Sequence, residues 1–220
     1  MRRAAFPLLL FLFGFVLGLL CLFPIHTGSS ELDAAPLTSD VRSEEESAPA
    51  QAASTSGLLL TAARTAEALK AEDYMTLGDL VHPERGLTFS AYSTVELSTD
   101  QNFTADEIRG LAENTKEYVW GYEDGRGAPI RMTMEAFVQQ YIFAVDYTQA
   151  PEVGVDQVVL SGNALENVAQ AYPGCRFVDL CYPELDPDLG GMDWCSLKLV
   201  FAPFEGQWRL VGLIHSQWTI

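Results

Sequence analysis

Residues 195–220 read CSLKLVFAPFEGQWRLVGLIHSQWTI and form the most strongly β-patterned stretch of the chain. Two apolar runs lie on either side of 202–206, where Pro203 and Gly206 supply turn chemistry. This pattern predicts an antiparallel hairpin. Because so apolar a final strand has to be covered by other segments, we expect it near the middle of its sheet.

The residues before the hairpin predict helices first and strands mostly afterwards. Apolar residues recur at steps of three and four over 58–81, which indicates two short helices, the second capped by Asp73. Thr104 begins a capping-box pattern and Thr133 is a further N-cap, so helices are also expected over 104–114 and 134–145. Expected strands are 87–92, 118–123, 130–132, 155–161, 176–182, 196–202 and 208–218. The second and third of these flank the glycine-containing stretch 124–127, which predicts a hairpin or a tight glycine loop. This order predicts an α+β domain over 57–220, with its helices on one face of a curved, mostly antiparallel sheet.

The N-terminal segment predicts a location at the membrane. Two arginines precede an apolar run over 4–25 that carries no charge and is long enough to span a bilayer as a helix. The basic residues favour a cytoplasmic N-terminus and an outer location for everything that follows. We expect 1–26 to be a retained transmembrane anchor, and the alternative is a cleaved signal peptide that releases a secreted protein.

A linker and an acidic domain follow the anchor. Residues 27–56 are rich in Ser, Ala, Pro and acid, a composition typical of a disordered linker. Residues 57–220 contain ten basic and 24 acidic residues within a chain whose net charge is −17. Nucleic acids and anionic bilayers are recognised through Lys and Arg, so this domain is not expected to bind either.

Several blocks of the domain resemble a known family. One feature is the order of the elements, with helices first and hairpin strands last. The others are the sequence blocks His82-Pro-Glu-Arg-Gly86, Trp120-Gly-Tyr-Glu-Asp-Gly125, 191–194 and 210–220. The chain resembles the cone-shaped α+β domains of the NTF2-like superfamily, and in particular uncharacterised extracytoplasmic domains of Gram-positive bacteria. The resemblance implies a fold and a compartment. It implies no activity, because such domains include enzymes, ligand binders and structural modules.

The hairpin also predicts where a ligand pocket would lie. With a turn centred between Phe204 and Glu205, Phe201 would face Trp208 and Cys195 would face Ile214. The face expected to be core carries Cys195, Leu197, Leu199, Phe201, Trp208, Leu210 and Ile214. The opposite face is the expected ligand pocket, with Trp194, Lys198, Arg209, His215 and Gln217.

Three residues are candidates for acid or base chemistry. His215 is the best of them because a histidine exchanges protons near neutral pH, and Asp146 or Asp193 would be its partner. A buried histidine satisfied by a neighbour is the simpler interpretation. The sequence contains no zinc-protease, nucleophile-elbow, paired C-x-x-C or phosphate-loop pattern, so we expect no cofactor and no metal site, and an enzyme is the less favoured function.

The cysteines of the domain raise the possibility of one disulfide bond. Cys181 and Cys195 lie on strands that should pair, so a cross-strand disulfide is a reasonable alternative to free thiols. Cys175 would then remain unpaired.

The sequence therefore favours a membrane-tethered extracytoplasmic module that binds a small molecule or an envelope protein. A small envelope enzyme that uses His215 inside the cone is the first alternative. A structural dimer formed through an exposed sheet face is the second.

Overall fold

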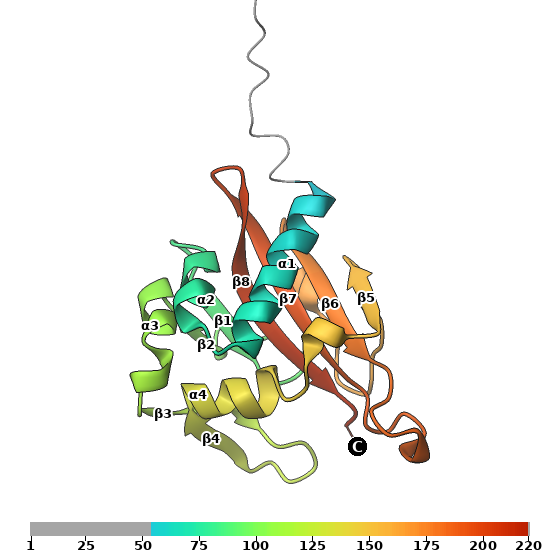
Figure 1. Ribbon diagram of the computed structural model, residues 1–220. Helices are drawn as coiled ribbons and strands as arrows, with labels where there is room; N and C mark the ends of the chain where they lie inside the picture. Colours follow the sequence, from blue (N-terminus) through green and yellow to red (C-terminus); the bar gives the residue numbers. More distant parts are fainter. Residues whose placement is uncertain (1–53, 220) are drawn as a thin grey trace, which may run out of the picture. The chain divides into compact units, whose positions relative to one another are not determined.

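The computed structural model describes residues 54–219, which contain two β-sheets and a set of short helices (Figure 1). The larger sheet has six strands in the order β2-β1-β8-β7-β6-β5, and the smaller one is the hairpin β3–β4. The α+β prediction is confirmed. The expected anchor over 4–25 and most of the expected linker lie outside the described residues.

The terminal hairpin forms the middle of the large sheet, as predicted. β7 (Cys195–Phe204) and β8 (Gln207–Gln217) pair antiparallel along their whole lengths. On one side follow β6 (Arg176–Tyr182) and β5 (Glu152–Val155), both antiparallel to their neighbours. On the other side β1 (Leu87–Ser90) runs parallel to β8 and antiparallel to β2 (Gln101–Phe103). The sheet is thus mostly antiparallel with a single parallel pair.

The turn of the hairpin differs from the prediction by one residue. Glu205 and Gly206 both have positive φ, 48° and 74°, which is the backbone of a tight two-residue hairpin turn. Phe204 therefore pairs with Gln207, and Trp208 pairs with Pro203 instead of Phe201. The expected register is wrong from its first pair.

A β-bulge in β8 then changes which side chains share a face. Phe201 pairs with Leu210, but the next pair is Val200 with Gly212, so Val211 is an extra residue. One extra residue reverses the alternation of side chains beyond it. The predicted core side chains up to Leu210 are confirmed, whereas Ile214 lies on the opposite face, where it packs with Val211.

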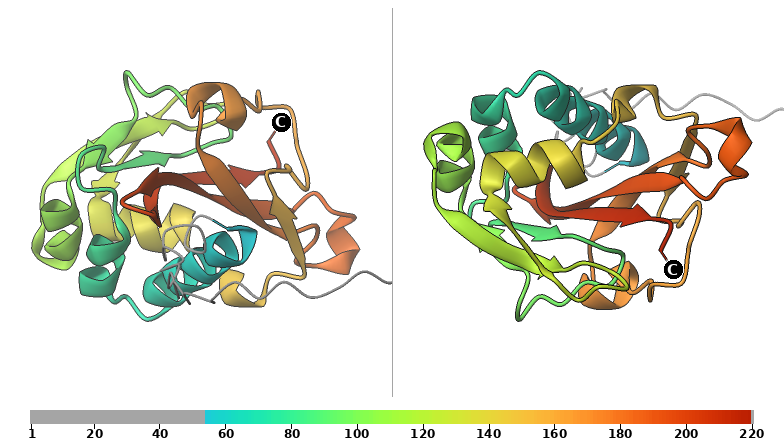
Figure 2. Two further views of the ribbon diagram at one scale, coloured as in Figure 1. Left: turned by 90° about the horizontal axis from the view of Figure 1, so that it is seen from above. Right: turned by 90° about the horizontal axis from the view of Figure 1, so that it is seen from below.

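The helices cover one face of the large sheet. α1 (Thr55–Lys70) lies across β6, β7 and β8, and α2 (Tyr74–Leu80), α4 (Met134–Phe137) and the π-helical turn η2 (Val138–Ile142) continue this layer (Figures 1 and 2). The main core between them includes Leu58, Leu69, Leu77, Phe89, Phe137, Ile142, Leu197, Leu199, Phe201, Leu210 and Leu213, all buried. The helical stretch expected to reach residue 145 ends at Ile142, because Phe143 leaves helical geometry.

The predicted N-caps are confirmed. The Asp73 carboxylate accepts a hydrogen bond from the Thr76 amide at 3.0 Å, at the start of α2. Thr104 and Glu107 form both bonds of a capping box at the start of α3 (Ala105–Arg109), which is followed by η1 (Leu111–Glu113). Local side-chain chemistry therefore sets where these helices begin.

The other face of the sheet is covered by residues 156–175, which include α5 (Val168–Ala171) (Figure 2). A second buried cluster joins this segment to the sheet through Val95, Val168, Tyr172, Phe177, Val200, Ala202, Val211 and Ile214. The strand expected over 155–161 is wrong, since β5 already ends at Val155. Asp156 has a φ of 52°, and its carboxylate accepts hydrogen bonds from the Phe177 amide and the Arg176 guanidinium, which turns the chain away from the sheet.

The hairpin β3 (Glu117–Tyr122) and β4 (Pro129–Thr133) packs beside β1 and α4. Its existence was predicted, but its separation from the large sheet was not. Within residues 54–219, no helix is both long and apolar enough to cross a membrane.

Candidate functional site

The residues of the predicted pocket do not form one site. After the bulge, His215 pairs with Leu197 and lies on the helix-covered face, while Lys198 pairs with Ile214 and lies on the opposite face. Arg209 lies near the hairpin turn, where its guanidinium donates to the Asp79 carbonyl. Trp194 is buried before β7, and only Gln217 remains next to His215. The sheet itself separates the side chains that were expected to converge.

His215 is enclosed in the main core. It is 3% exposed, its Nε2 lies 3.2 Å from Oε1 of Gln217, and the Tyr141 ring meets it edge-on at 6.1 Å. Burial lowers the pKa of its imidazole to about 4, so the ring is neutral near pH 7. This arrangement matches the simpler interpretation of a buried histidine only in part: Nε2 has Gln217 as its neighbour, whereas Nδ1 is buried without a hydrogen-bond partner among residues 54–219.

The two carboxylates proposed as partners of His215 have other roles. Asp146 accepts a hydrogen bond from the Thr148 hydroxyl and lies 2.9 Å from Lys70 Nζ, and these contacts lower the pKa of its carboxyl. Asp193 accepts from the amides of Leu185 and Asp186 and so closes the loop 183–193. Neither carboxylate is hydrogen-bonded to His215 within the described chain.

Lys198 belongs to a buried polar network. Its side chain is fully buried, and its Nζ lies 3.1 Å from Oε1 of Glu166 and 2.7 Å from Oγ of Ser216. The Ser93 hydroxyl donates to the same Ser216 oxygen at 2.9 Å. These contacts tie the loop after β1, the segment that contains Glu166 and the two central strands together.

The cysteines cannot form the predicted bridge. Cys181 pairs with Ser196 across β6 and β7, while Cys195 pairs with Tyr182. Directly opposed residues share a face and successive residues alternate, so Cys181 and Cys195 point to opposite faces. The cysteines of residues 54–219 are free, and burial raises the pKa of the Cys181 thiol to about 12. Cys175 is partly exposed, and Nη1 of Arg85 lies 3.1 Å from its sulfur.

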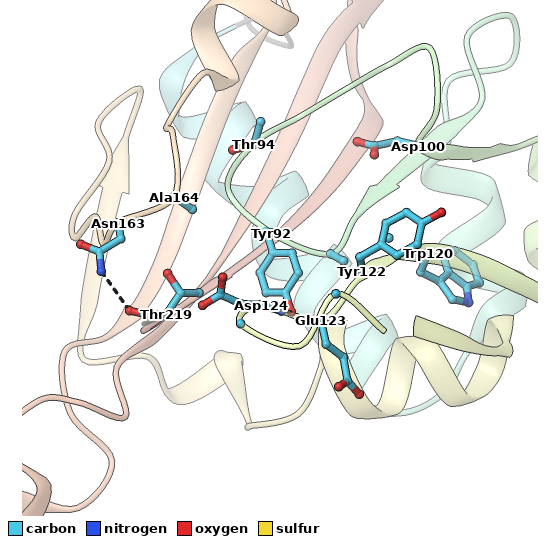
Figure 3. A pocket seen from close by; sticks show the side chains of 14 residues that line it. Tyr92, Thr94, Asp100, Trp120, Tyr122, Glu123, Asp124, Asn163, Ala164 and Thr219 are labelled. Carbon is cyan, nitrogen blue, oxygen red and sulfur yellow. Dashed lines mark hydrogen bonds between the residues drawn. The ribbon is translucent and has the colours of Figure 1, made fainter. Parts of the chain in front are cut away.

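The structure shows a different candidate site, a cleft of about 560 Å³ (Figure 3). Its walls are the loop after β1, the turn of the β3–β4 hairpin and a part of the segment that covers the second sheet face. A volume of this size is typical of a small-molecule site. The lining includes Tyr92, Asp100, Trp120, Tyr122, Glu123, Asp124, Asn163, Ala164 and Thr219. We refer to it as the acidic cleft.

Tyr92 and the hairpin turn form the centre of the acidic cleft. The Asp124 amide donates to the Tyr92 hydroxyl at 3.3 Å, which joins two walls. Gly125 and Gly127 have positive φ, 69° and 63°, which lets the turn from Glu123 to 128 close tightly. Figure 3 shows the Tyr92 ring and the Asp124 side chain next to each other in the middle of the site.

Asp100 lies at one end of the cleft. Its Oδ2 accepts hydrogen bonds from the Ser90 hydroxyl at 2.5 Å and from the Glu96 amide at 3.1 Å. Burial raises the pKa of this carboxyl, and the two hydrogen bonds partly offset that effect. The carboxylate is therefore held in one position, half-buried, with both bonds on the same oxygen.

The rest of the cleft is rigidly supported. Trp120 is buried, stacks on Phe137 with ring centroids 4.1 Å apart, and donates from Nε1 to the Met132 carbonyl. At the other end, Nδ2 of Asn163 donates to the Thr219 carbonyl at 3.1 Å (Figure 3). A smaller and mainly apolar groove of about 210 Å³ lies elsewhere, between α1 and β5–β6.

Sequence reasoning missed the acidic cleft because its residues come from four separate segments. The glycine turn at 124–127 was recognised only as a connection between strands. The run of aromatic and acidic residues from Trp120 to Asp124, just before this turn, is the local sequence signal that could have indicated a binding role.

Comparisons with known proteins give only distant likenesses. No family model and no curated protein matches the chain. One similar solved structure is a protein of unknown function from the DUF3225 family of Pectobacterium atrosepticum, with 10% identity, a TM-score of 0.34, and coverage of 73% of this chain and 88% of that one. Another is a putative calcium/calmodulin-dependent protein kinase II association domain from Xanthomonas campestris, with 10% identity, a TM-score of 0.31, and coverage of 74% and 84%.

Proposed function

We propose that this protein is a membrane-tethered extracytoplasmic module of NTF2-like type that binds a small molecule in the acidic cleft. The observation that carries the proposal is the cleft itself, which combines a suitable volume with aromatic rings and polar groups held by fixed partners. The membrane tether and the outer location rest on the apolar run at 4–25 and the arginines before it.

Binding is favoured over catalysis because the acid and base candidates are not assembled. His215 is buried among core residues, and Asp146 and Asp193 bond to other groups. A general base has to come within hydrogen-bond reach of its substrate or partner. The cleft meets the needs of a binding site without such a pair.

A cleft-filling substitution tests this proposal. Ala164 lines the cleft and is half-buried, so Ala164→Trp should occupy the ligand's space. Ala112 is exposed in η1 and lies away from the cleft lining, so Ala112→Trp is the matched control. A fragment set of amines, sugars, amides and alcohols is screened against the full-length protein in maltoside micelles by ligand-observed NMR.

We expect at least one fragment to bind the wild type and the Ala112→Trp variant and to lose binding in Ala164→Trp. The proposal is wrong if every fragment that binds does so equally in both variants, or if none of the four classes binds. Circular dichroism of the two variants shows whether the fold is retained.

A further inference from the structure

The charges around the acidic cleft are of one sign. Asp100, Glu123 and Asp124 contribute carboxyl groups, and within the described chain no lysine or arginine belongs to the lining. Arg126, which does not line the cleft, has its guanidinium 4.0 Å from the Glu123 carboxylate; because the Arg126 side chain is 84% exposed, this pair offsets the charge of Glu123 only weakly. A concave site with carboxylates of one sign focuses a negative potential, which attracts cations and repels anions.

Aromatic rings lie in the same space as these carboxylates. Figure 3 shows the ring of Tyr92 between Asp124 and the end at which Asp100 lies, and the ring of Tyr122 farther along, near Trp120. The Tyr122 side chain is 64% exposed, so its ring is available for contact. The face of an aromatic ring attracts an organic cation, and the attraction is larger where water is partly excluded.

We infer that the ligand of the acidic cleft is a small organic cation, an alkylamine or a quaternary ammonium compound. This inference rests on the function proposed above and specifies the ligand's chemistry. The ammonium group contacts the rings of Tyr92 and Tyr122 and is balanced by the carboxylate of Asp100. Both hydrogen bonds to Asp100 fall on Oδ2, so Oδ1 is left to the ligand.

An organic cation fits better than a metal ion. Metal ions are held by several ligands within about 2.0 to 2.6 Å of one point. Residues 54–219 contain no group of three or more His, Cys, Asp or Glu side chains close enough to hold one. The carboxylates of the cleft are spread along its walls, as Figure 3 shows, and a cation with an organic body can span that space.

Probe pairs that differ in charge but not in shape test the inference. Choline is compared with 3,3-dimethylbutan-1-ol, its uncharged carbon analogue, and butylamine with butan-1-ol. Affinities for the full-length protein in maltoside micelles are measured by calorimetry at low salt. We expect at least one cation to bind tenfold or more tightly than its neutral partner, and the pair that shows this distinguishes a quaternary from a primary ammonium ligand.

Two charge-removing variants locate the effect. Asp100→Asn removes the fixed carboxylate and should weaken binding of the preferred cation at least fivefold. Asp188→Asn removes the same charge from an exposed site in the short 3-10 helix η4 (Pro187–Leu189) and should change binding less than twofold. Raised salt screens long-range attraction. The difference in cation affinity between the Asp100→Asn and Asp188→Asn variants should therefore persist largely unchanged at raised salt.

The outcomes separate this inference from the proposed function. If neutral partners bind as tightly as the cations and Ala164→Trp abolishes both, the cleft is a ligand site but the cation assignment is wrong. Equal effects of Asp100→Asn and Asp188→Asn would also overturn it, because binding would then follow net charge alone. If no probe or fragment binds in a way that Ala164→Trp removes, the proposed function is wrong as well.

Discussion

At the scale of single residues, the protein places ionisable groups in its interior, and each has a measurable consequence. Burial lowers the pKa of His215 to about 4, whereas an exposed histidine titrates near 6.5. Between pH 6.5 and 4 the imidazole of His215 is therefore protonated in the unfolded chain but stays neutral in the folded chain. Stability from this residue is present above about pH 6.5 and is lost as the pH falls toward 4.

We expect the free energy of unfolding to fall between pH 6.5 and 4 by up to about 3 kcal/mol from this residue. His215→Gln keeps a polar side chain beside Gln217 but cannot titrate, so its stability should depend less on pH in this window. Urea unfolding at a series of pH values measures the difference. Parallel pH profiles for the two proteins would show that His215 is not buried in its neutral form.

The ion pair of Lys198 and Glu166 leads to a second prediction. Removing one member of a buried pair leaves the other charge without compensation, which costs about 3–5 kcal/mol. Lys198→Met should therefore be strongly destabilising, because the Lys198 side chain is fully buried and that of Glu166 is 16% exposed. The double variant Lys198→Met with Glu166→Gln should recover a large part of the loss in urea unfolding. A double variant no more stable than Lys198→Met alone would contradict a coupled pair.

At the scale of elements, the bulge in β8 determines which side chains face the helices. Gly212 follows the bulge, and a Cβ atom there would lie 2.7 Å from the Tyr172 hydroxyl oxygen and 3.3 Å from Cβ of Val200. Because Tyr172 belongs to the segment that covers this face, the missing side chain of Gly212 lets that segment lie directly on the strand.

Gly212→Ala should therefore cost about 1–3 kcal/mol, the range for overpacking a buried site. In a Tyr172→Leu background, Gly212→Ala should lower the free energy of unfolding by less than it does in the wild type, because the close contact with the tyrosine hydroxyl is gone. Gly110→Ala is the control, since its Cβ would meet its nearest neighbour at 3.7 Å. Thermal unfolding of the wild type, the three single variants Gly212→Ala, Tyr172→Leu and Gly110→Ala, and the double variant tests this. Equal costs at Gly212 and Gly110 would contradict the close contact.

The elements also show how far sequence reasoning reaches. Strong local signals were sufficient for the central hairpin, the caps at Asp73 and Thr104, and the hairpin β3–β4. The bulge at Val211 exchanges the faces of Ile214 and His215. Gly212 beside it is a residue type that often marks a bulge, but a glycine alone does not determine which residue is extra. The acidic cleft depends on contacts between distant segments, such as Tyr92 with Asp124, which no single stretch encodes.

At the scale of the whole molecule, the arrangement of anchor, linker and domain is a prediction of the sequence. Two arginines before the apolar run at 4–25 favour an N-terminus in the cytoplasm. Protease added to intact cells should cut within 27–56 and release the domain, while the membrane fraction retains the N-terminal fragment. Full-length protein left uncut by this treatment, or domain found in the soluble cell fraction, would contradict the predicted orientation.

Hydrogen exchange measured by mass spectrometry on the full-length protein tests the claim that a ligand binds in the acidic cleft. Exchange is compared without ligand and with a saturating amount of the tightest-binding probe. Slower exchange is predicted in 91–100, 120–127 and 160–167, which form the walls, with α1 and the loop 183–193 unchanged. Protection confined to α1 and β5, where the smaller groove lies, or absent from the three wall segments, would contradict the claim.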